Sequence, residues 1–154
     1  MTFSLGDTLP DLTLSDAAGT PTRLAATNGR KRVIYFYPKD DTPGCTREGQ
    51  DFTRLHAEFA AADTDVIGIS KDSAASHQRF AEKYGFTFTL LADPDQQACR
   101  AFDVIHEKVN YGRKYLGVVR STFLFDAHGV LQREWRGVKV AGHAEAVLEA
   151  ACAL

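Results

Sequence analysis

Residues 35–48 read YFYPKDDTPGCTRE, and they place one thiol at the start of a helix that follows a buried strand. Val33 to Tyr37 is an almost unbroken run of apolar, β-prone residues, which is typical of a strand covered on both faces. Thr42 is suited to cap a helix, Pro43 fits the first helical position, and Cys45 follows within the first turn. The unpaired N–H groups and the positive end of the helix dipole at this point favour the thiolate form of Cys45.

The apolar residues after Cys45 recur with the period of a helix, on one face: Phe52, Leu55, Phe59 and Ala62. Cys45 and Gly49 extend this face toward the amino end, so the thiol points partly into the protein. It lies at the carboxyl end of a strand, where open α/β sheets place their active sites. The alternative is an inert, buried cysteine. The cap, the Pro and the Gly beside Cys45 favour a reactive thiol instead.

The other two cysteines have different surroundings. Cys99 and Cys152 both lie inside helical patterns, with no cap and no Gly/Pro loop beside them. For each of them a structural role is the better interpretation.

Composition and charge narrow the possible functions. A chain of 154 residues that is 44% hydrophobic predicts one domain, residues 1–154, with a substantial core. The net charge of −2 gives no broad attraction to nucleic acid or to an anionic membrane, and the short basic cluster Arg30-Lys31-Arg32 is typical of a turn. No apolar run is long enough to span a bilayer, and three cysteines make no disulfide framework. We therefore expect a soluble, cytoplasmic protein.

The pattern of the chain predicts strands and helices in a mixed order. The expected elements are a hairpin (9–14 and 20–24), a strand (33–37), a helix (43–62), a strand (66–70), a helix (73–84) capped by Asp72 and closed by Gly85, a strand (86–90), a short helix after Pro94, a second hairpin (122–125 and 130–135) and a final helix (144–154). The strand-helix-strand unit predicts parallel strands with a right-handed crossover. This order indicates an α/β protein with a thioredoxin-like mixed sheet flanked by helices, to which the N-terminal β-hairpin is an extension.

The motif Pro38-x-x-x-Thr42-x-x-Cys45 resembles the active-site signature of peroxiredoxins. The wider stretch 37–46 is similar to the bacterioferritin-comigratory (Q-type) subfamily, and so are the segments 6–12, 120–126 and 135–143. The resemblance runs nearly end to end. It implies a thiol-dependent peroxidase that reduces hydrogen peroxide and organic hydroperoxides for antioxidant defence.

The resemblance also implies roles for single residues. Cys45 would be the peroxidatic cysteine, Thr42 its hydroxyl partner, Pro38 the residue that shields the site, and Arg120 the cation beside the sulfur. These residue types suit the chemistry, because a thiolate that attacks a peroxide needs donors for the sulfur and for the leaving oxygen. From the local sequence alone, an arginine at a strand start such as Arg120 is usually a surface residue, and it is the resemblance that favours the site role. Glu48, one turn beyond Cys45, either orients an arginine or is a simple helix-surface acid.

This chain departs from the subfamily pattern at the resolving cysteine. In one Q-type subgroup that cysteine lies five residues after the peroxidatic one, but here Gln50 stands there. In another subgroup it lies near the position of Ala81, and no cysteine occurs between Cys45 and Cys99. Either an external thiol reduces the sulfenic acid directly, in a one-cysteine cycle, or Cys99 resolves it. We favour the one-cysteine cycle.

Two other classes of protein share parts of this pattern. A thiol–disulfide oxidoreductase has two thiols two residues apart at the helix start, and Thr42 occupies the first of those positions. A redox sensor or binding module without turnover would explain Cys45 but gives no reason for Thr42 and Arg120. The scattered histidines predict no metal site, and no glycine-rich phosphate loop occurs, so we expect no cofactor. The expected partners are a peroxide and thioredoxin, glutaredoxin or a small thiol, with the protein a monomer or weak dimer.

Overall fold

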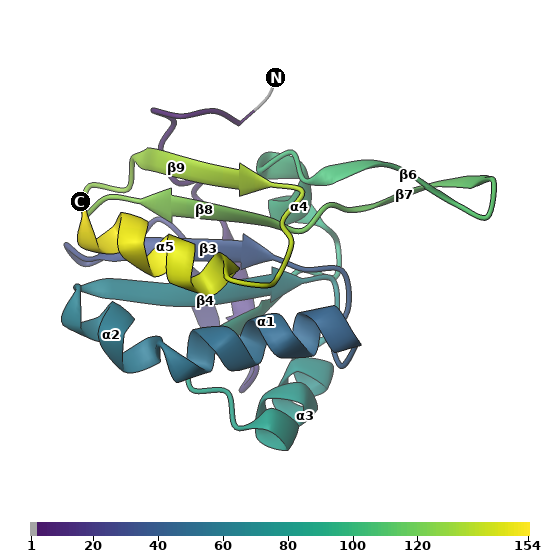
Figure 1. The fold of residues 1–154 in the computed structure, drawn as a ribbon, viewed down its shortest axis with the longest axis horizontal. Helices are drawn as coiled ribbons and strands as arrows, with labels where there is room; N and C mark the ends of the chain where they lie inside the picture. Colours follow the sequence, from purple (N-terminus) through teal and green to yellow (C-terminus); the bar gives the residue numbers. More distant parts are fainter. Residues whose placement is uncertain (1–2) are drawn as a thin grey trace.

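The computed structural model describes residues 3–154, which form a twisted mixed sheet with helices on both faces (Figure 1). Within these residues the main sheet has seven strands in the order β2-β1-β5-β4-β3-β8-β9, and β6 and β7 pair separately. The strands are β1 Thr13–Asp16, β2 Pro21–Arg23, β3 Lys31–Phe36, β4 Thr64–Ser70, β5 Thr89–Ala92, β6 Ile105–Asn110, β7 Arg113–Val118, β8 Ser121–Phe125 and β9 Leu131–Arg136. The helices are α1 Pro43–Arg54, α2 His56–Ala61, α3 Ala74–Tyr84, α4 Gln97–Ala101 and α5 His143–Cys152.

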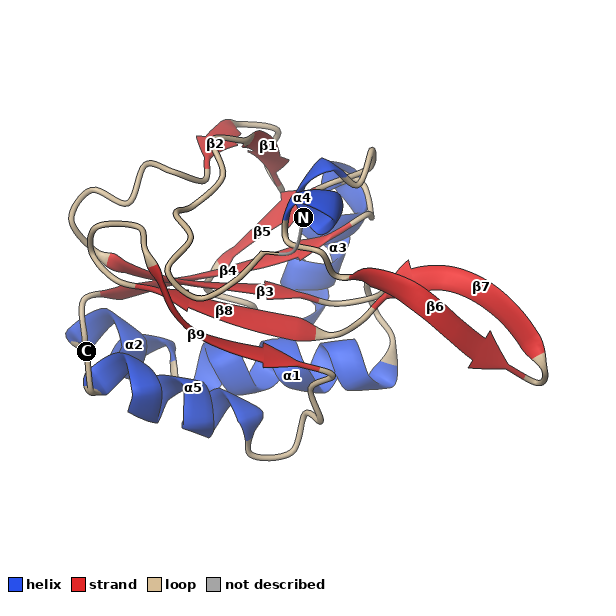
Figure 2. Cartoon of the chain, turned by 90° about the horizontal axis from the view of Figure 1, so that it is seen from above, coloured by secondary structure: helices blue, strands red, loops and turns tan. Residues whose placement is uncertain are grey.

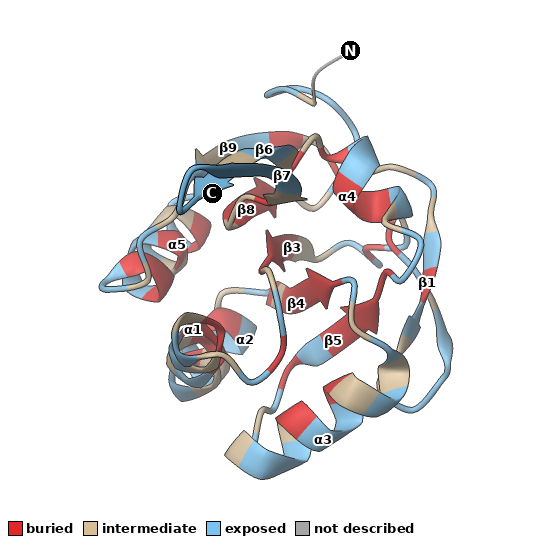
Figure 3. Cartoon of the chain, turned by 90° about the vertical axis from the view of Figure 1, so that its right-hand side faces the viewer, coloured by how far each residue is buried: buried red, intermediate tan, exposed pale blue. Residues whose placement is uncertain are grey.

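The sheet separates two hydrophobic cores, because successive side chains of a strand point to opposite faces. Val33 and Tyr35 of β3 belong to the core beneath α1, α3 and α5, whereas Ile34 and Phe36 belong to the core beneath α4. Seen from above, α1, α2 and α5 lie on one side of the strands and α4 on the other (Figure 2). The buried residues concentrate on the strands and on the helix faces turned toward them (Figure 3).

The central strand β3 organises the sheet. It pairs in parallel with β4, from Lys31 opposite Thr64 to Phe36 opposite Ile69, and this confirms the predicted parallel unit. On its other side β3 pairs antiparallel with β8, and Phe36 stands opposite Ser121. The end of β3 therefore lies beside the start of β8, although 75 residues separate Cys45 from Arg120 in the sequence.

Several predicted elements are confirmed, with shifted ends. The N-terminal hairpin is β1 and β2, and it joins the main sheet because β1 pairs with β5. The late hairpin is β8 and β9, the short helix after Pro94 is α4, and the final helix is α5. Gly85 ends α3 in the left-handed conformation (φ 68°), as predicted.

The single helix expected over 43–62 is wrong, because Leu55 separates two helices. Its backbone (φ −96°, ψ 3°) leaves the helical region, and α2 begins at the next residue. The apolar face survives the break, since Phe52, Leu55 and Phe59 are all buried in one core.

Two further expectations are corrected. The cap of α3 is Ser73, whose Oγ accepts a bond from the Ser76 N–H, because the Asp72 carboxylate is occupied by the Asp40 N–H and the Ser70 hydroxyl. The strand expected over 86–90 is β5 at Thr89–Ala92. Phe86 precedes it and packs where Gly49 of α1 leaves room, since a Cβ on Gly49 would lie 2.3 Å from the Phe86 ring.

The hairpin of β6 and β7 is absent from the sequence prediction. Its residues are mostly exposed, so neither strand carries the alternation of apolar and polar residues that marks a half-buried strand. Tyr111 (φ 52°) and Gly112 (φ 75°) form its turn, as a two-residue hairpin loop requires. The hairpin projects from the body of the protein on the side where β3 ends (Figure 1).

Candidate active site

Cys45 is the third residue of α1 and lies just beyond the carboxyl end of β3. Thr42 occupies the cap position with an extended backbone, and Pro43 is the first helical residue, as predicted. The N–H groups of Gly44 and Cys45 therefore belong to the first turn, where a helix leaves its amides without an intrahelical partner. The Cys45 side chain packs into the core beneath α1, and the residue is 2% exposed.

The expected capping bond of Thr42 is not formed. Its hydroxyl donates to the carbonyl oxygen of Lys39 instead, at 2.9 Å. This bond fixes the hydroxyl proton toward the loop, so the lone pairs of the Thr42 oxygen are left to accept a bond from another molecule. Pro38 lies half-buried in the same loop.

Arg120 reaches the sulfur of Cys45 from the segment between β7 and β8. Its Nη2 lies 3.4 Å from Cys45 Sγ, and its Nη1 donates to Glu48 Oε1 at 2.7 Å. Gly44 permits this approach, since a Cβ there would lie 3.1 Å from Nη2. Burial lowers the pKa of Arg120, but Glu48 and Cys45 outweigh that effect and raise it overall. The guanidinium is therefore a fixed positive charge beside the thiol.

Glu48 is buried one turn beyond Cys45 and bonds Arg120, so the sequence alternative of a surface acid is wrong. Burial raises the pKa of Glu48 to about 7, although the charge and hydrogen bond of Arg120 oppose the shift. Its second oxygen, Oε2, has no hydrogen-bond partner among residues 3–154. The pair thus combines a permanent cation with a buried acid whose pKa lies well above its usual value.

The sequence predicted no role for two residues whose pKa the charge of Arg120 lowers. His143 bonds the Thr122 hydroxyl through Nε2 at 2.7 Å, and burial, with the charge of Arg120 added, lowers its pKa to about 4. Burial also lowers the pKa of Lys108 on β6, and the charge of Arg120 adds to that shift. Lys108 is therefore a second cation within electrostatic reach of the site. The position of Lys108 near the site could not be predicted, because the β6–β7 hairpin that carries it was not predicted.

The other thiols are remote from Cys45. Cys99 is buried in the opposite core beneath α4, where burial and then the charge of Asp93 raise its pKa. Cys152 is exposed at the end of α5, beside Lys31 at the start of β3. In Figure 1 that end of α5 lies at the left, and the first turn of α1 lies at the right. The sheet thus separates Cys45 from Cys99, and the length of β3 separates it from Cys152.

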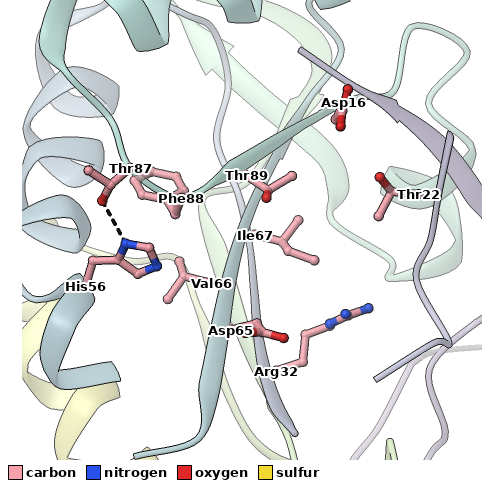
Figure 4. A pocket seen from close by; sticks show the side chains of 10 residues that line it. All are labelled: Asp16, Thr22, Arg32, His56, Asp65, Val66, Ile67, Thr87, Phe88 and Thr89. Carbon is pink, nitrogen blue, oxygen red and sulfur yellow. Dashed lines mark hydrogen bonds between the residues drawn. The ribbon is translucent and has the colours of Figure 1, made fainter. Parts of the chain in front are cut away.

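A cleft of about 330 Å³ lies away from this site and is lined by residues of β1 to β5, with His56, Thr87 and Phe88 at one end (Figure 4). At that end His56 bonds Thr87 at 2.8 Å. The Arg32 guanidinium donates to the carbonyls of Leu24 and Ala26, so this charge serves the loop after β2. The cleft contains no thiol.

Residues 3–154 contain no group of three or more His, Cys, Asp or Glu side chains placed to hold a metal ion. In the same range, every helix is too short or too polar to cross a membrane.

Comparisons with known proteins agree with these features. Residues 5–134 match the model of the AhpC/TSA family. Peroxiredoxin Bcp of Xanthomonas campestris is 55% identical over 140 residues, covering 91% of this chain and 88% of that protein. Peroxiredoxin Bcp of Bacillus subtilis is 45% identical over 149 residues, covering 97% and 95%.

A solved structure gives the same result for the fold. The bacterioferritin comigratory protein of Xanthomonas campestris, whose alkyl peroxide reduction activity has been described, superposes with a TM-score of 0.90 at 52% identity. The alignment covers 96% of this chain and 98% of that one. The resemblance inferred from the signature around Cys45 and the thioredoxin-like fold are confirmed. The chain belongs to the AhpC/TSA family and is a peroxiredoxin of the Bcp, or Q-type, group, a thiol-dependent peroxidase.

Proposed function

We propose that Cys45 is the peroxidatic cysteine, with Arg120, Thr42 and Pro38 as the other residues of the site. The observation that carries this proposal is the contact of Arg120 Nη2 with Cys45 Sγ at 3.4 Å, at the first turn of α1. A guanidinium and a helix amino end both stabilise a thiolate. Cys99 is also the third residue of a helix, but there the Asp93 carboxylate accepts the bonds from the N–H groups of Ala98 and Cys99. Cys152 is the last residue of α5.

The reaction begins when the Cys45 thiolate attacks one oxygen of the peroxide. An S–O bond forms and the O–O bond breaks, so the sulfur is oxidised to a sulfenic acid and the peroxide is reduced. The other oxygen leaves as hydroxide or alkoxide and takes a proton from water. Negative charge moves from the sulfur toward this oxygen. Arg120 and the amides of the first turn stabilise that charge, because their dipoles are already oriented.

The remaining residues orient the substrate and the cation. The Thr42 hydroxyl accepts a bond from the O–H of the peroxide, since its own proton is committed to Lys39. Pro38, in the same loop, shields the sulfur from water. Glu48 holds one side of the guanidinium while the other side faces the sulfur. A free hydroperoxide group is all that this site requires, so we infer that hydrogen peroxide and alkyl hydroperoxides are both substrates.

The second half of the cycle uses an external thiol. Gln50 and Ala81 stand where Q-type relatives carry a resolving cysteine. Cys99 lies in the opposite core. A disulfide needs Cα atoms within about 7 Å, so a bond from Cys45 to Cys99 would require the sheet to open. An incoming thiol instead attacks the sulfenic acid, releases water and forms a mixed disulfide, which a second thiol reduces.

Thioredoxin, glutaredoxin or a small thiol is the proposed reductant. Because this cycle consumes reduced thiols, we place the protein in the cytoplasm. We further propose that residues 1–154 act as a single domain, and that the protein is a monomer or weak dimer. The reaction needs no cofactor.

The first prediction tests the nucleophile. Cys45→Ser should abolish peroxide reduction, because the thiol that the Arg120 guanidinium contacts at 3.4 Å is lost. Cys99→Ala and Cys152→Ser, as matched controls, should keep the rate of the first oxidation within about twofold of wild type, since both sulfurs are remote. Stopped-flow measurement of a single turnover checks this. Substantial turnover by Cys45→Ser would refute the assignment.

The second prediction concerns the cation. Arg120→Met should lower the rate constant for peroxide reduction by about 100-fold or more, the usual effect of removing one preorganised donor. Arg54→Met, on the exposed side of α1, is the control and should change the rate by less than about twofold. An unchanged rate in Arg120→Met would show that the guanidinium takes no part in the reaction.

The third prediction concerns Glu48 and pH. Burial raises the folded-state pKa of Glu48 from 4.5 to about 7, so the stability contributed by its bound proton is complete below pH 4.5 and is lost as the pH rises through 7. Wild type should therefore lose stability relative to Glu48→Gln over this range, by up to about 3 kcal/mol. Urea unfolding at a series of pH values measures the difference. Parallel curves for the two proteins would contradict it.

The fourth prediction concerns recycling. After one equivalent of peroxide and addition of a small thiol, Cys45 should carry that thiol as a mixed disulfide. Excess peroxide without thiol should produce sulfinic acid on Cys45, because no internal sulfur captures the sulfenic acid first. Peptide mapping without reduction detects both products. A dominant Cys45–Cys99 linkage would make Cys99 the resolving residue.

A further inference from the structure

A buried polar network ties the loop before Cys45 to α3. The Asp40 carboxylate, in this loop, accepts bonds from the Tyr37 hydroxyl at 2.6 Å and from the Ser76 hydroxyl at 2.8 Å. Its Oδ2 also lies 2.7 Å from Nδ1 of His77. Asp40, Tyr37 and His77 are all buried, and His77 is 0% exposed. None of these side chains has a part in the proposed reaction.

The geometry fixes where a proton lies. His77 Nε2 is 3.0 Å from the carbonyl oxygen of Leu91 on β5, which can only accept, so Nε2 carries a hydrogen. On the other side of the ring, Nδ1 meets an oxygen of Asp40 at 2.7 Å. Two lone pairs would repel at that distance, so a second proton lies between Nδ1 and Asp40. The His77 ring therefore bridges β5 and the loop through two hydrogen bonds.

The neighbouring groups reinforce this bridge. Burial, then Tyr35 and Asp40, raise the pKa of Tyr37 well above its usual value, so Tyr37 remains a donor to Asp40. The Asp40 N–H donates to Asp72, whose carboxylate also accepts from Ser70. Outside the buried network, the exposed Lys83 of α3 bonds Asp41 at 2.8 Å.

This network controls the short segment that carries Thr42 and leads into Cys45. The segment from residue 37 to residue 42 belongs to neither a strand nor a helix. Backbone bonds hold its two ends, from the Tyr37 N–H to Ile69 and from the Thr46 N–H to Thr42, and the bonds of Asp40 hold its middle. Asp40 is two residues from Thr42, and the Thr42 hydroxyl bonds back to Lys39 beside Asp40. A displacement of Asp40 therefore moves the hydroxyl and the first turn of α1 relative to Arg120.

We propose that Asp40 and His77 are positioning residues that hold this loop in the conformation that attacks peroxide. The inference rests on the proposed function of Cys45. It has a second consequence, because Cys45 is 2% exposed and an external thiol can reach it only when the first turn opens. The network opposes that opening. Weakening it should slow oxidation by peroxide and speed the reduction of the sulfenic acid by thiol.

The experiment compares two replacements of the same ring. His77→Gln keeps an amide N–H for the Leu91 carbonyl but removes the imidazole donor to Asp40, whereas His77→Asn keeps a donor near Asp40. His77→Gln and Asp40→Asn should lower the rate constant for peroxide by about 10- to 100-fold, the scale expected for a small misplacement of reacting groups. His77→Asn should recover part of that loss. Lys83→Met, which removes the exposed tie between the same two elements, is the control and should stay within about twofold of wild type.

The two half-reactions separate positioning from a general loss of structure. In stopped-flow experiments, His77→Gln and Asp40→Asn should oxidise more slowly and be reduced by a small thiol at least as fast as wild type. Equal slowing of both steps would overturn the proposal, as would wild-type rates in both variants. If Asp40→Asn does not fold, Tyr37→Phe removes one donor to Asp40 and should show the same opposite changes on a smaller scale.

A spectroscopic measurement tests the network without relying on turnover. With ¹⁵N-labelled histidine, the proton between His77 Nδ1 and Asp40 should give a far-downfield signal in wild type and in Cys45→Ser. Asp40→Asn should lose that signal, and its persistence there would overturn the proposed pairing. If wild type reduces no peroxide while the signal is present, the proposed function fails and the pairing stands.

Discussion

The contact between the Arg120 guanidinium and the Cys45 sulfur depends on the antiparallel pairing of β3 with β8. That pairing sets Ser121 opposite Phe36, and so brings the residue before β8 to the loop that leaves β3. The loop turns directly into α1, whose first turn carries Cys45. A one-residue slip of β8 would direct its side chains to the opposite face of the sheet and remove the cation from the sulfur. Burial of β8 on both faces fixes this register.

The largely buried positive charge of Arg120 needs a partner of opposite charge, and Glu48 is that partner. Burying Glu48 itself costs free energy. The carboxylate and the guanidinium offset each other's loss of hydration, but one Glu48 oxygen finds no hydrogen-bond partner in residues 3–154. The pKa of Glu48 is raised because the effect of burial is larger than the opposing effect of Arg120. The site therefore holds a charge arrangement that folding alone does not favour. The apolar packing beneath α1 offsets the cost of this arrangement. Within it, the rings of Tyr35 and Phe52 stack with their centroids 4.7 Å apart.

Local features of the sequence were enough to locate the helix start at Cys45. Pro43 permits only the first helical position, and the apolar run before it admits little besides a strand. Arg120 required the family resemblance, because it is 75 residues from Cys45 in the sequence and only the pairing of β3 with β8 brings the two together. Ser73 caps α3 in place of Asp72 because the Asp72 carboxylate accepts a bond from the Asp40 N–H, a contact that the local sequence does not reveal. The β6–β7 hairpin was not predicted because its strands are mostly exposed and so lack the alternation of apolar and polar residues that a buried face requires.

The position of the sheet between Cys45 and Cys99 determines what limits the lifetime of the oxidised protein. In the proposed cycle, Cys45 and Cys99 stay apart on opposite faces of the sheet, so one molecule does not complete the cycle alone. Each oxidised molecule waits for a collision, so the waiting time is set by the concentration of reduced thiol in the surroundings. In that cycle, the sheet between Cys45 and Cys99 makes the lifetime of the oxidised protein depend on the concentration of thiol in the solution. The oxidised fraction of the protein then reflects the balance between peroxide and thiol.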